Sequence, residues 1–193
     1  MNPQNFFSKN LGITDKKVIQ AFENIITVRE FSKNERIFSE GEIPSNFYFN
    51  IKGIFRGYMF NQDGSEITDC FGFRAGAPIT SVNRIGEPAK TNMEAVTNLT
   101  AIQMPMTDLI TLIENNPELL AIYNNLLQEA LDRHWKIKEA RYRLSATDRY
   151  KWFLETYPDL IEYVRMKDIA SFLGMSPVSL SRIRKTLKEM NEQ

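Results

Sequence analysis

The spacing of apolar residues changes along the chain and separates helical from strand-forming segments. Apolar side chains recur at helical spacing over residues 18–26, which predicts a short amphipathic helix ending near Ile26. Over residues 27–106 they gather instead in short runs rich in aromatic and β-branched side chains, separated by turn-forming residues. Asp63 and Gly64 lie between two such runs and predict a hairpin. Short strands without intervening helices predict a small antiparallel β-sandwich, roll or barrel.

The second half of the chain has helical spacing throughout, beginning with one long helix. Pro117 follows Asn116, and proline is favourable as the first residue of a helix. From there apolar residues alternate in steps of three and four, interrupted only at Arg133. This heptad pattern predicts a helix that pairs with a second copy of itself; packing only on its own domain is the alternative. The predicted dimer seam consists of Leu119, Tyr123, Leu126, Ala130, Ile137, Ala140 and Leu144.

Three shorter helices are predicted after the long one. The segments SATDRYKWFLETYPDL and MKDIASFL are amphipathic, and a third helix extends from Pro177 to about Met190. Gly174 provides the positive φ that a sharp turn needs, and Ser176 before Pro177 provides a hydroxyl cap and a favourable first residue. The last helix has an apolar stripe, formed by Leu180, Ile183, Leu187 and Met190.

The opposite face of the last helix carries small polar and basic side chains, with no acidic residue before Glu189. Hydroxyls reach phosphates or base edges, and arginine can bind guanine with two hydrogen bonds. Two helices joined by a three-residue turn, the second basic, predict a helix-turn-helix; a solvated basic face is the alternative. The candidate DNA-binding residues are Ser176, Pro177, Val178, Ser179, Ser181, Arg182, Lys185 and Lys188.

Charge and composition refine this interpretation. The net charge is zero, but residues 1–132 carry a net of −5 and residues 133–193 a net of +5. This asymmetry is typical of a basic DNA-binding module attached to an acidic sensor. No apolar run is long enough to span a membrane, and the N-terminus lacks the layout of a signal peptide, so we expect a cytoplasmic protein without membrane contact.

Cysteine and histidine usage excludes several chemistries. One cysteine, Cys70, allows neither an internal disulfide nor an iron–sulfur cluster. A metal enzyme built on a β-barrel usually needs two or three histidines, and this chain has only His134. A lone helical histidine is more often a surface or packing residue than a haem ligand. We therefore expect neither a metal site nor an enzyme.

The order of these parts resembles the Crp–Fnr (catabolite activator) transcription regulators over almost the whole chain. The resemblance implies a cyclic-nucleotide-binding-like β-roll over residues 1–115, a dimerisation helix over 116–144 and a DNA-binding domain over 145–193. It also places Arg182 on the base-contacting arginine, whereas Pro177 and Val178 replace an arginine and a glutamate, so the operator should differ. The matching positions are Gly41, Glu42, Tyr48, Gly53 and Arg56, and then Ile169, Ala170, Leu173, Gly174, Ser176, Ser179, Arg182 and Ile183.

The expected effector site departs from the cyclic AMP binders of this family. Those proteins carry Gly-Glu for the ribose and an arginine for the cyclic phosphate. Here Ala77 and Pro78 follow Gly76, and the late basic residue is Lys90, which lacks a bidentate fork. The effector is therefore left unknown, with cyclic AMP disfavoured. The resemblance places the pocket at Phe71, Gly72, Lys90, Thr91, His134 and Trp135, where Trp135 would fill the space of the base.

Taken together, the sequence predicts a homodimeric transcription regulator that binds a double-stranded operator. It is expected to respond to a small effector other than cyclic AMP, or to none. RNA polymerase is a further candidate partner. The alternative is a ligand-binding or dimerising β-roll that does not bind DNA.

Overall fold

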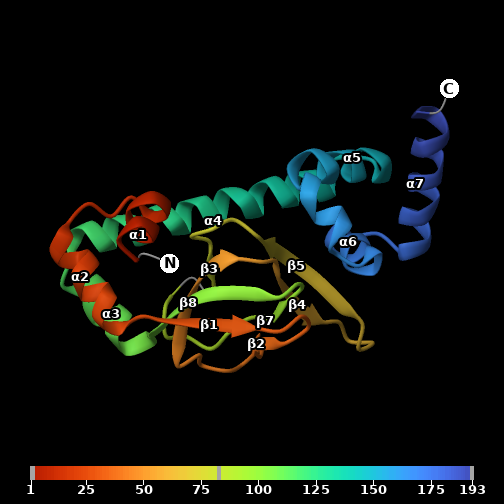
Figure 1. The fold of residues 1–193 in the computed structure, drawn as a ribbon. Coiled ribbons are helices and arrows are strands. Elements are labelled where there is room, and N and C mark those ends of the chain that lie inside the picture. Colours follow the sequence, from red (N-terminus) through yellow and green to blue (C-terminus); the bar gives the residue numbers. More distant parts are fainter. Residues whose placement is uncertain (1–2, 82–83, 192–193) are drawn as a thin grey trace. The chain divides into compact units, whose positions relative to one another are not determined.

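The structure, a computed structural model, describes residues 3–81 and 84–191. It contains two four-stranded β-sheets followed by a long helix and shorter C-terminal helices, which confirms the expected combination of a β-roll and a helix-turn-helix domain (Figure 1). The strands are β1 (Thr27–Phe31), β2 (Arg36–Phe38), β3 (Asn46–Lys52), β4 (Phe55–Phe60), β5 (Glu66–Gly72), β6 (Pro78–Ile79), β7 (Asn92–Ala95) and β8 (Leu99–Pro105).

The two sheets are built from strands that lie far apart in the sequence. One sheet has the order β1-β8-β3-β6 and the other the order β2-β7-β4-β5. In the first, β8 pairs antiparallel with β1 from Thr27 opposite Gln103 to Phe31 opposite Leu99, and on its other side with β3. Both faces of β8 are covered, because Leu99 and Ala101 belong to one apolar cluster and Ile102 and Met104 to another. The roll closes only when its last strand is in place.

The interior of the roll combines an apolar cluster with one buried ion pair. Phe31, Phe38, Met93 and Leu99 belong to this cluster and are at most 5 % exposed. The guanidinium of Arg56, fully buried on β4, lies 2.8 Å from a carboxylate oxygen of Glu94 on β7. This pair ties two neighbouring strands together.

A close backbone approach explains the glycine at position 53, one of the positions that carry the resemblance to the Crp–Fnr regulators. Gly53, in the turn between β3 and β4, has φ +104°, and a Cβ there would lie 2.6 Å from the carbonyl oxygen of Asn98. Any side chain would therefore push apart the turn and the start of β8.

Three helices beside the first sheet form a second apolar cluster. They are α1 (Pro3–Leu11), α2 (Lys16–Ile25) and α3 (Met106–Glu114). The buried rings of Phe7 and Phe22 stack with centroids 4.7 Å apart. The sequence pattern predicts α2 correctly, but it does not predict α1 or α3. In α1 the neighbouring Phe6 and Phe7 define no helical period. In α3 the apolar residues Met106, Leu109 and Ile113 do recur at helical spacing, but this helix follows β8 without an intervening turn.

The remaining helices follow the predicted segments closely. They are α4 (Pro117–Arg143), α5 (Ala146–Thr156), α6 (Met166–Phe172) and α7 (Pro177–Asn191), with a short 3₁₀ turn, η1 (Pro158–Glu162), between α5 and α6. Ser145 caps α5 by accepting a hydrogen bond from the N–H of Asp148, at 3.2 Å.

The chain forms two compact units. Residues 1–57 and 71–129 make up the first unit, and residues 58–70 and 130–193 the second. The hairpin between β4 and β5 therefore groups with the C-terminal helices. The domain boundaries expected at 115/116 and 144/145 stay a prediction.

Candidate nucleic-acid interface

The turn between α6 and α7 has the geometry that the sequence predicts. Gly174 has φ +65°, its N–H donates to the carbonyl of Ser171 at 3.0 Å, and the N–H of Met175 donates to the carbonyl of Ala170 at 3.0 Å. These are the two hydrogen bonds of a Schellman motif, in which a left-handed glycine ends a helix. The turn therefore fixes where α7 begins relative to α6 (Figure 1).

Ser176 caps the N-terminus of α7. Its hydroxyl accepts a hydrogen bond from the N–H of Ser179 at 3.1 Å and lies 2.9 Å from the hydroxyl of Ser179. Its carbonyl accepts from the N–H of Leu180, the first bond of the helix proper. Ser176 and Ser179 thus share one hydrogen-bonded arrangement at the exposed start of α7, where unpaired N–H groups attract anions.

A compact core holds the two helices. Ile169, Ala170 and Leu180 are completely buried, so α6 and α7 cross closely at small or apolar side chains. Beneath them, the ring of Phe172 lies 5.9 Å from that of Phe153 and 5.7 Å from that of Tyr157. The sequence pattern does not single out this aromatic cluster. Burial raises the pKa of Tyr157 to about 12, because its ionised form would lose solvation.

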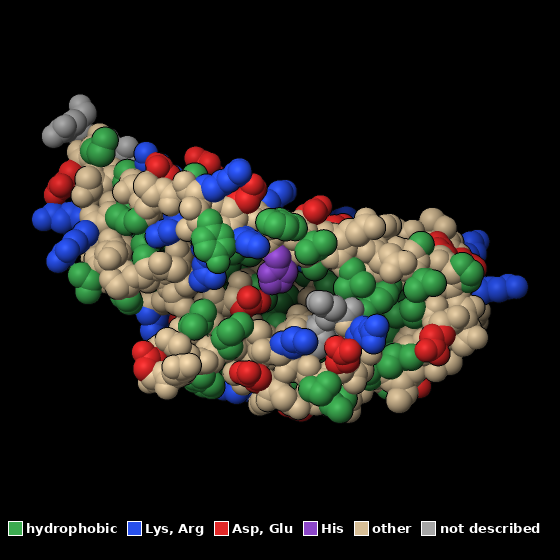
Figure 2. Space-filling view, turned by 180° about the vertical axis from the view of Figure 1, so that it is seen from behind, with side chains coloured by type: hydrophobic (Ala, Val, Ile, Leu, Met, Phe, Trp, Pro, Cys, Tyr) green, Lys and Arg blue, Asp and Glu red, His purple; other side chains and the backbone are tan. Residues whose placement is uncertain are grey.

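All candidate DNA-binding residues lie exposed on α7 or its cap. We call Val178, Ser179, Arg182 and Lys185 the recognition face; the side chain of Val178 is 60 % exposed and therefore open to a partner. Figure 2 shows basic side chains (blue) along the edge formed by α7. The predicted buried stripe needs correction: Leu180 is buried and Ile183 and Leu187 are half-buried, but Met190 is 65 % exposed.

The first helix of the pair is fastened to the β4–β5 hairpin within the same unit. The hydroxyl of Ser171 on α6 accepts a hydrogen bond from the N–H of Thr68 at 2.8 Å and donates to the carbonyl of Glu66 at 3.0 Å. Arg165 binds Asp168 at 2.6 Å and approaches the carboxylate of Glu66 at 3.8 Å. Sequence reasoning missed this contact, because it joins residues more than a hundred positions apart.

The C-terminal end of α4 also supports α6. A guanidinium nitrogen of Arg141 donates to the carbonyl of Ser171 at 3.0 Å, and Arg149 donates to the carbonyl of Arg141 at 2.9 Å. Carbonyls at helix C-termini lack partners within the helix, and basic side chains stabilise them. The two arginines therefore link α4, α5 and α6.

The predicted effector residues divide between the two units. Phe71, Gly72, Lys90 and Thr91 belong to the first unit, and His134 and Trp135 to the second. The phenyl ring of Phe55 packs against Gly72 so closely that a Cβ would lie 2.0 Å from it. Thr91 is 4 % exposed and its hydroxyl has no hydrogen-bond partner among the described residues. Trp135 is 54 % exposed, with the ammonium group of Lys138 4.6 Å from its ring centroid.

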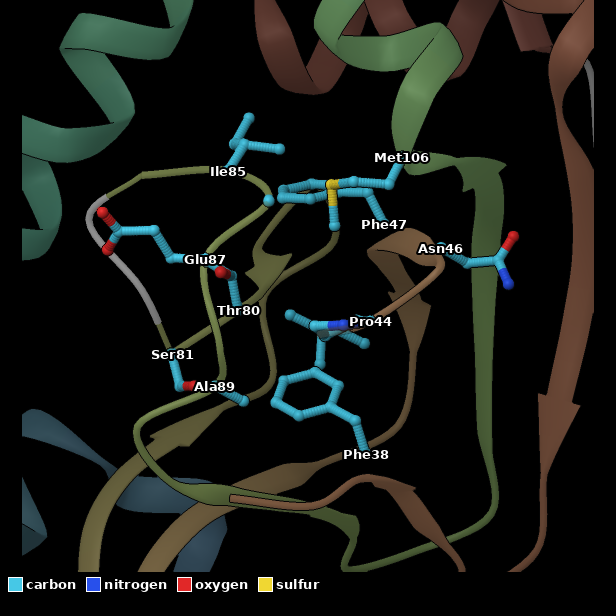
Figure 3. A pocket seen from close by; sticks show the side chains of 12 residues that line it. Phe38, Pro44, Asn46, Phe47, Thr80, Ser81, Ile85, Glu87, Ala89 and Met106 are labelled. Carbon is cyan, nitrogen blue, oxygen red and sulfur yellow. The ribbon is translucent and has the colours of Figure 1, made fainter. Parts of the chain in front are cut away.

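A small cavity opens beside the loop that follows β6. In Figure 3 it is bordered by Phe38, Pro44, Phe47 and Met106, while the carboxylate of Glu87 points away from it. Its volume of about 10 Å³ is enough for about one water molecule, so a nucleotide does not fit there. None of the six predicted effector residues lines it.

The apolar residues of α4 form two rows. In the predicted seam, Leu119, Ile137 and Ala140 are at most 8 % exposed because they pack within the chain itself. A second row, offset by one residue or roughly 100° around the helix, is open to solvent. We call this the exposed row; it consists of Leu120, Leu127, Leu131, Trp135 and Tyr142, of which all but the half-buried Leu127 are 47–80 % exposed.

The described residues hold neither a candidate metal site nor a candidate membrane-spanning helix. Among residues 3–81 and 84–191, no group of three or more His, Cys, Asp or Glu side chains is arranged to hold a metal ion. Within the same ranges, no helix combines the length and apolar character needed to cross a membrane.

Comparison with known proteins defines the class to which this fold belongs. Residues 28–116 match the cyclic nucleotide-binding domain. The nitrogen fixation regulation protein FixK of Bradyrhizobium diazoefficiens is 25 % identical over 179 residues, which cover 87 % of this chain and 74 % of FixK. The chain is thus similar to a bacterial regulation protein over most of its length.

Solved structures share the architecture. FixK2 from Bradyrhizobium japonicum superposes with a TM-score of 0.78 at 17 % identity, covering 86 % of each chain. The c-di-GMP-responsive global regulator CLP of Xanthomonas campestris gives a TM-score of 0.75 at 17 % identity, covering 92 % of this chain and 93 % of CLP. The domain match, the relative and the shared fold together confirm the resemblance to the Crp–Fnr regulators.

Proposed function

We propose that this protein is a homodimeric, sequence-specific DNA-binding transcription regulator whose α7 enters the major groove. The observation that carries the proposal is the recognition face on a helix with a serine cap, anchored at Leu180 and presenting Arg182 to solvent. Arg182 has the donors to bind a guanine edge, Val178 to contact a thymine methyl, and the hydroxyls of Ser176 and Ser179 to bind phosphate.

Selection of binding sites from a random duplex library tests this function. The selected sites should contain two half-sites related by two-fold symmetry, about one helical turn apart. Arg182→Ala should lower affinity for the selected site by roughly ten- to a hundredfold while changing binding to random duplex much less. Thr186→Ala, on the same helix, is the matched control. Absence of any duplex binding would favour the alternative, a β-roll module without DNA binding.

We also propose that the exposed row of α4 forms the dimer contact. A patch of large apolar side chains on one helix face is typical of a helix that pairs with another. This proposal rests on the burial of three of the seven seam residues, Leu119, Ile137 and Ala140, within the chain; the seam itself stays a prediction. Two-fold symmetry would then place two copies of α7 on successive turns of DNA.

The proposed effector is a small molecule other than cyclic AMP, or none. The Gly-Glu pair of cyclic AMP binders is missing, because Ala77 and Pro78 follow Gly76, and Pro78 is paired in β6 opposite Phe49 of β3. The buried hydroxyl of Thr91 has no hydrogen-bond partner among the described residues, which supports a ligand with a polar atom near Thr91. Operator affinity measured with and without cyclic AMP should be the same; a saturable change would contradict this part of the proposal.

Three further assignments belong to the same proposal. The protein is a regulator rather than an enzyme and acts in the cytoplasm. Its sensor, dimerisation and DNA-binding parts span residues 1–115, 116–144 and 145–193. RNA polymerase is a partner at the promoter, which in vitro transcription from a selected site would reveal as activation or repression.

A further inference from the structure

A basic groove runs between α5 and α7, beside the recognition face. Tyr150, Lys151 and Leu154 line it from α5, and Arg184, Lys185, Leu187 and Lys188 from α7. Both helices belong to one compact unit. The groove is an open depression of about 680 Å³, so a segment of a polymer can lie across it.

All charged residues that line this groove are basic. Four of its seven lining residues are basic and exposed, and no aspartate or glutamate is among them. Among the described residues, Glu189 on the same helix forms an exposed ion pair with Lys185 at 3.8 Å. A solvent-exposed ion pair contributes little to stability, so an anionic partner can replace Glu189 beside Lys185. The groove therefore fits a partner with repeated negative charges.

Its floor holds one of the cations in place. The hydroxyl of Tyr150 is hydrogen-bonded to Arg184, and the tyrosine is only 4 % exposed. Burial raises the pKa of Tyr150, so this hydroxyl stays protonated at neutral pH. Leu154 and Leu187 complete an apolar surface between the basic side chains, and aliphatic lysine stems extend it.

The groove is continuous with the recognition face. Arg182, Lys185 and Lys188 follow one another in steps of three along α7, so their side chains are neighbours on the helix surface. Lys185 belongs to both surfaces. A DNA strand bordering the major groove occupied by α7 would meet the next cations on this path, Lys188 on α7 and Lys151 on α5.

We propose that the α5–α7 groove is a second DNA contact, which binds the sugar–phosphate backbone flanking the bases contacted by the recognition face. This inference rests on the proposed function and extends it to α5, a helix outside the helix-turn-helix pair. Phosphates pair with the four cations, and the apolar floor meets deoxyribose. Contacts of this kind position the protein and supply affinity without sequence preference.

The test is the salt dependence of binding, measured by fluorescence anisotropy on a random duplex and on a selected site. The double variant Lys151→Ala, Lys188→Ala should reduce the slope of log Kd against log salt by about one for each phosphate that the protein no longer binds. It should weaken binding to both duplexes by the same factor. Lys151→Arg, Lys188→Arg should retain the slope, and Lys16→Ala, on the exposed face of α2, is the matched control.

The outcomes separate this inference from the function on which it rests. If the wild-type protein binds no duplex, the proposed function fails, and the groove proposal fails with it. If the wild type binds and Arg182→Ala loses discrimination, but the double variant keeps the full slope, only the groove proposal is overturned. The groove would then belong to another anionic partner, such as an acidic protein segment. Circular dichroism confirms that each variant is folded.

Discussion

At the scale of single residues, the turn that positions α7 depends on Gly174. Its φ of +65° lies in the left-handed region, where a β-carbon strains the backbone. Gly174→Ala should therefore lower the free energy of unfolding by about 1 kcal/mol, measured by urea denaturation. Gly174→Asn should lose less, because asparagine tolerates this conformation better. Equal losses for both variants would contradict a conformational cause.

Tyr157 provides a prediction about alkaline pH. Its folded pKa is about 12 and its ordinary value is 10.0, with burial as the main cause, nearby Cys70 raising it further and Arg133 opposing. A tyrosine whose pKa is higher in the folded state adds to the free energy of unfolding, and this contribution is fully present below pH 10. It is lost as the pH rises toward 12, because in that range the tyrosine ionises more readily in the unfolded state.

The variant Tyr157→Phe cannot ionise at this position. We expect the wild type to lose about 3 kcal/mol more stability than Tyr157→Phe between pH 10 and 12, since two pKa units correspond to that free energy. Thermal unfolding of both proteins across this range measures the difference. Parallel stability curves would refute the assignment.

At the scale of elements, α6 acts as a partner for the edge of a sheet. β5 is the last strand in the order β2-β7-β4-β5, and the Ser171 hydroxyl satisfies both the N–H of Thr68 and the carbonyl of Glu66. In an extended strand these two groups point toward the same side, so one hydroxyl replaces part of a missing neighbouring strand.

Removal of this hydroxyl leaves a buried N–H and a carbonyl unpaired. Ser171→Ala should lower stability by about 1–3 kcal/mol, measured by chemical denaturation. Ser8→Ala, at an exposed position on α1, should change stability by less than about 0.5 kcal/mol. A loss at Ser171 no greater than at Ser8 would mean that water replaces the hydroxyl at the strand edge.

At this scale, how well the sequence predicts a feature depends on how far apart along the chain the interacting residues are. The cap at Ser176, the glycine turn and the bounds of α4 to α7 depend on residues a few positions apart, so local patterns predict them. The Ser171 bridge, the pairing of β1 with β8 and the groove beside Lys151 depend on residues brought together by folding. A periodic pattern also indicates that α4 has an apolar face, but not which part of it the chain covers by itself.

At the scale of the whole molecule, the proposed dimer depends on the exposed row of α4. Leu131→Glu places a charge in the middle of this row, where Leu131 is 58 % exposed, and should convert the dimer to a monomer. Operator affinity should fall with it, because two half-sites can no longer be bound together. Light scattering coupled to size exclusion measures the first effect.

The matched control is Asn125→Glu, an exposed position on another side of the same helix. This variant should remain dimeric and bind the operator like the wild type. A wild-type protein that is monomeric at micromolar concentration would refute the dimer, and a dimeric Leu131→Glu variant would place the interface elsewhere.

The bridge between Ser171 and β5 also bears on how the protein emerges from the ribosome. The two ends of this bridge are 103 residues apart in the chain. At the usual speed of bacterial synthesis, about 5–20 residues per second, β5 waits on the order of 5–20 s before α6 can cover its edge. During that interval the strand offers unpaired backbone groups to other nascent chains, so we expect fragments that end before α6 to aggregate more readily than the full chain.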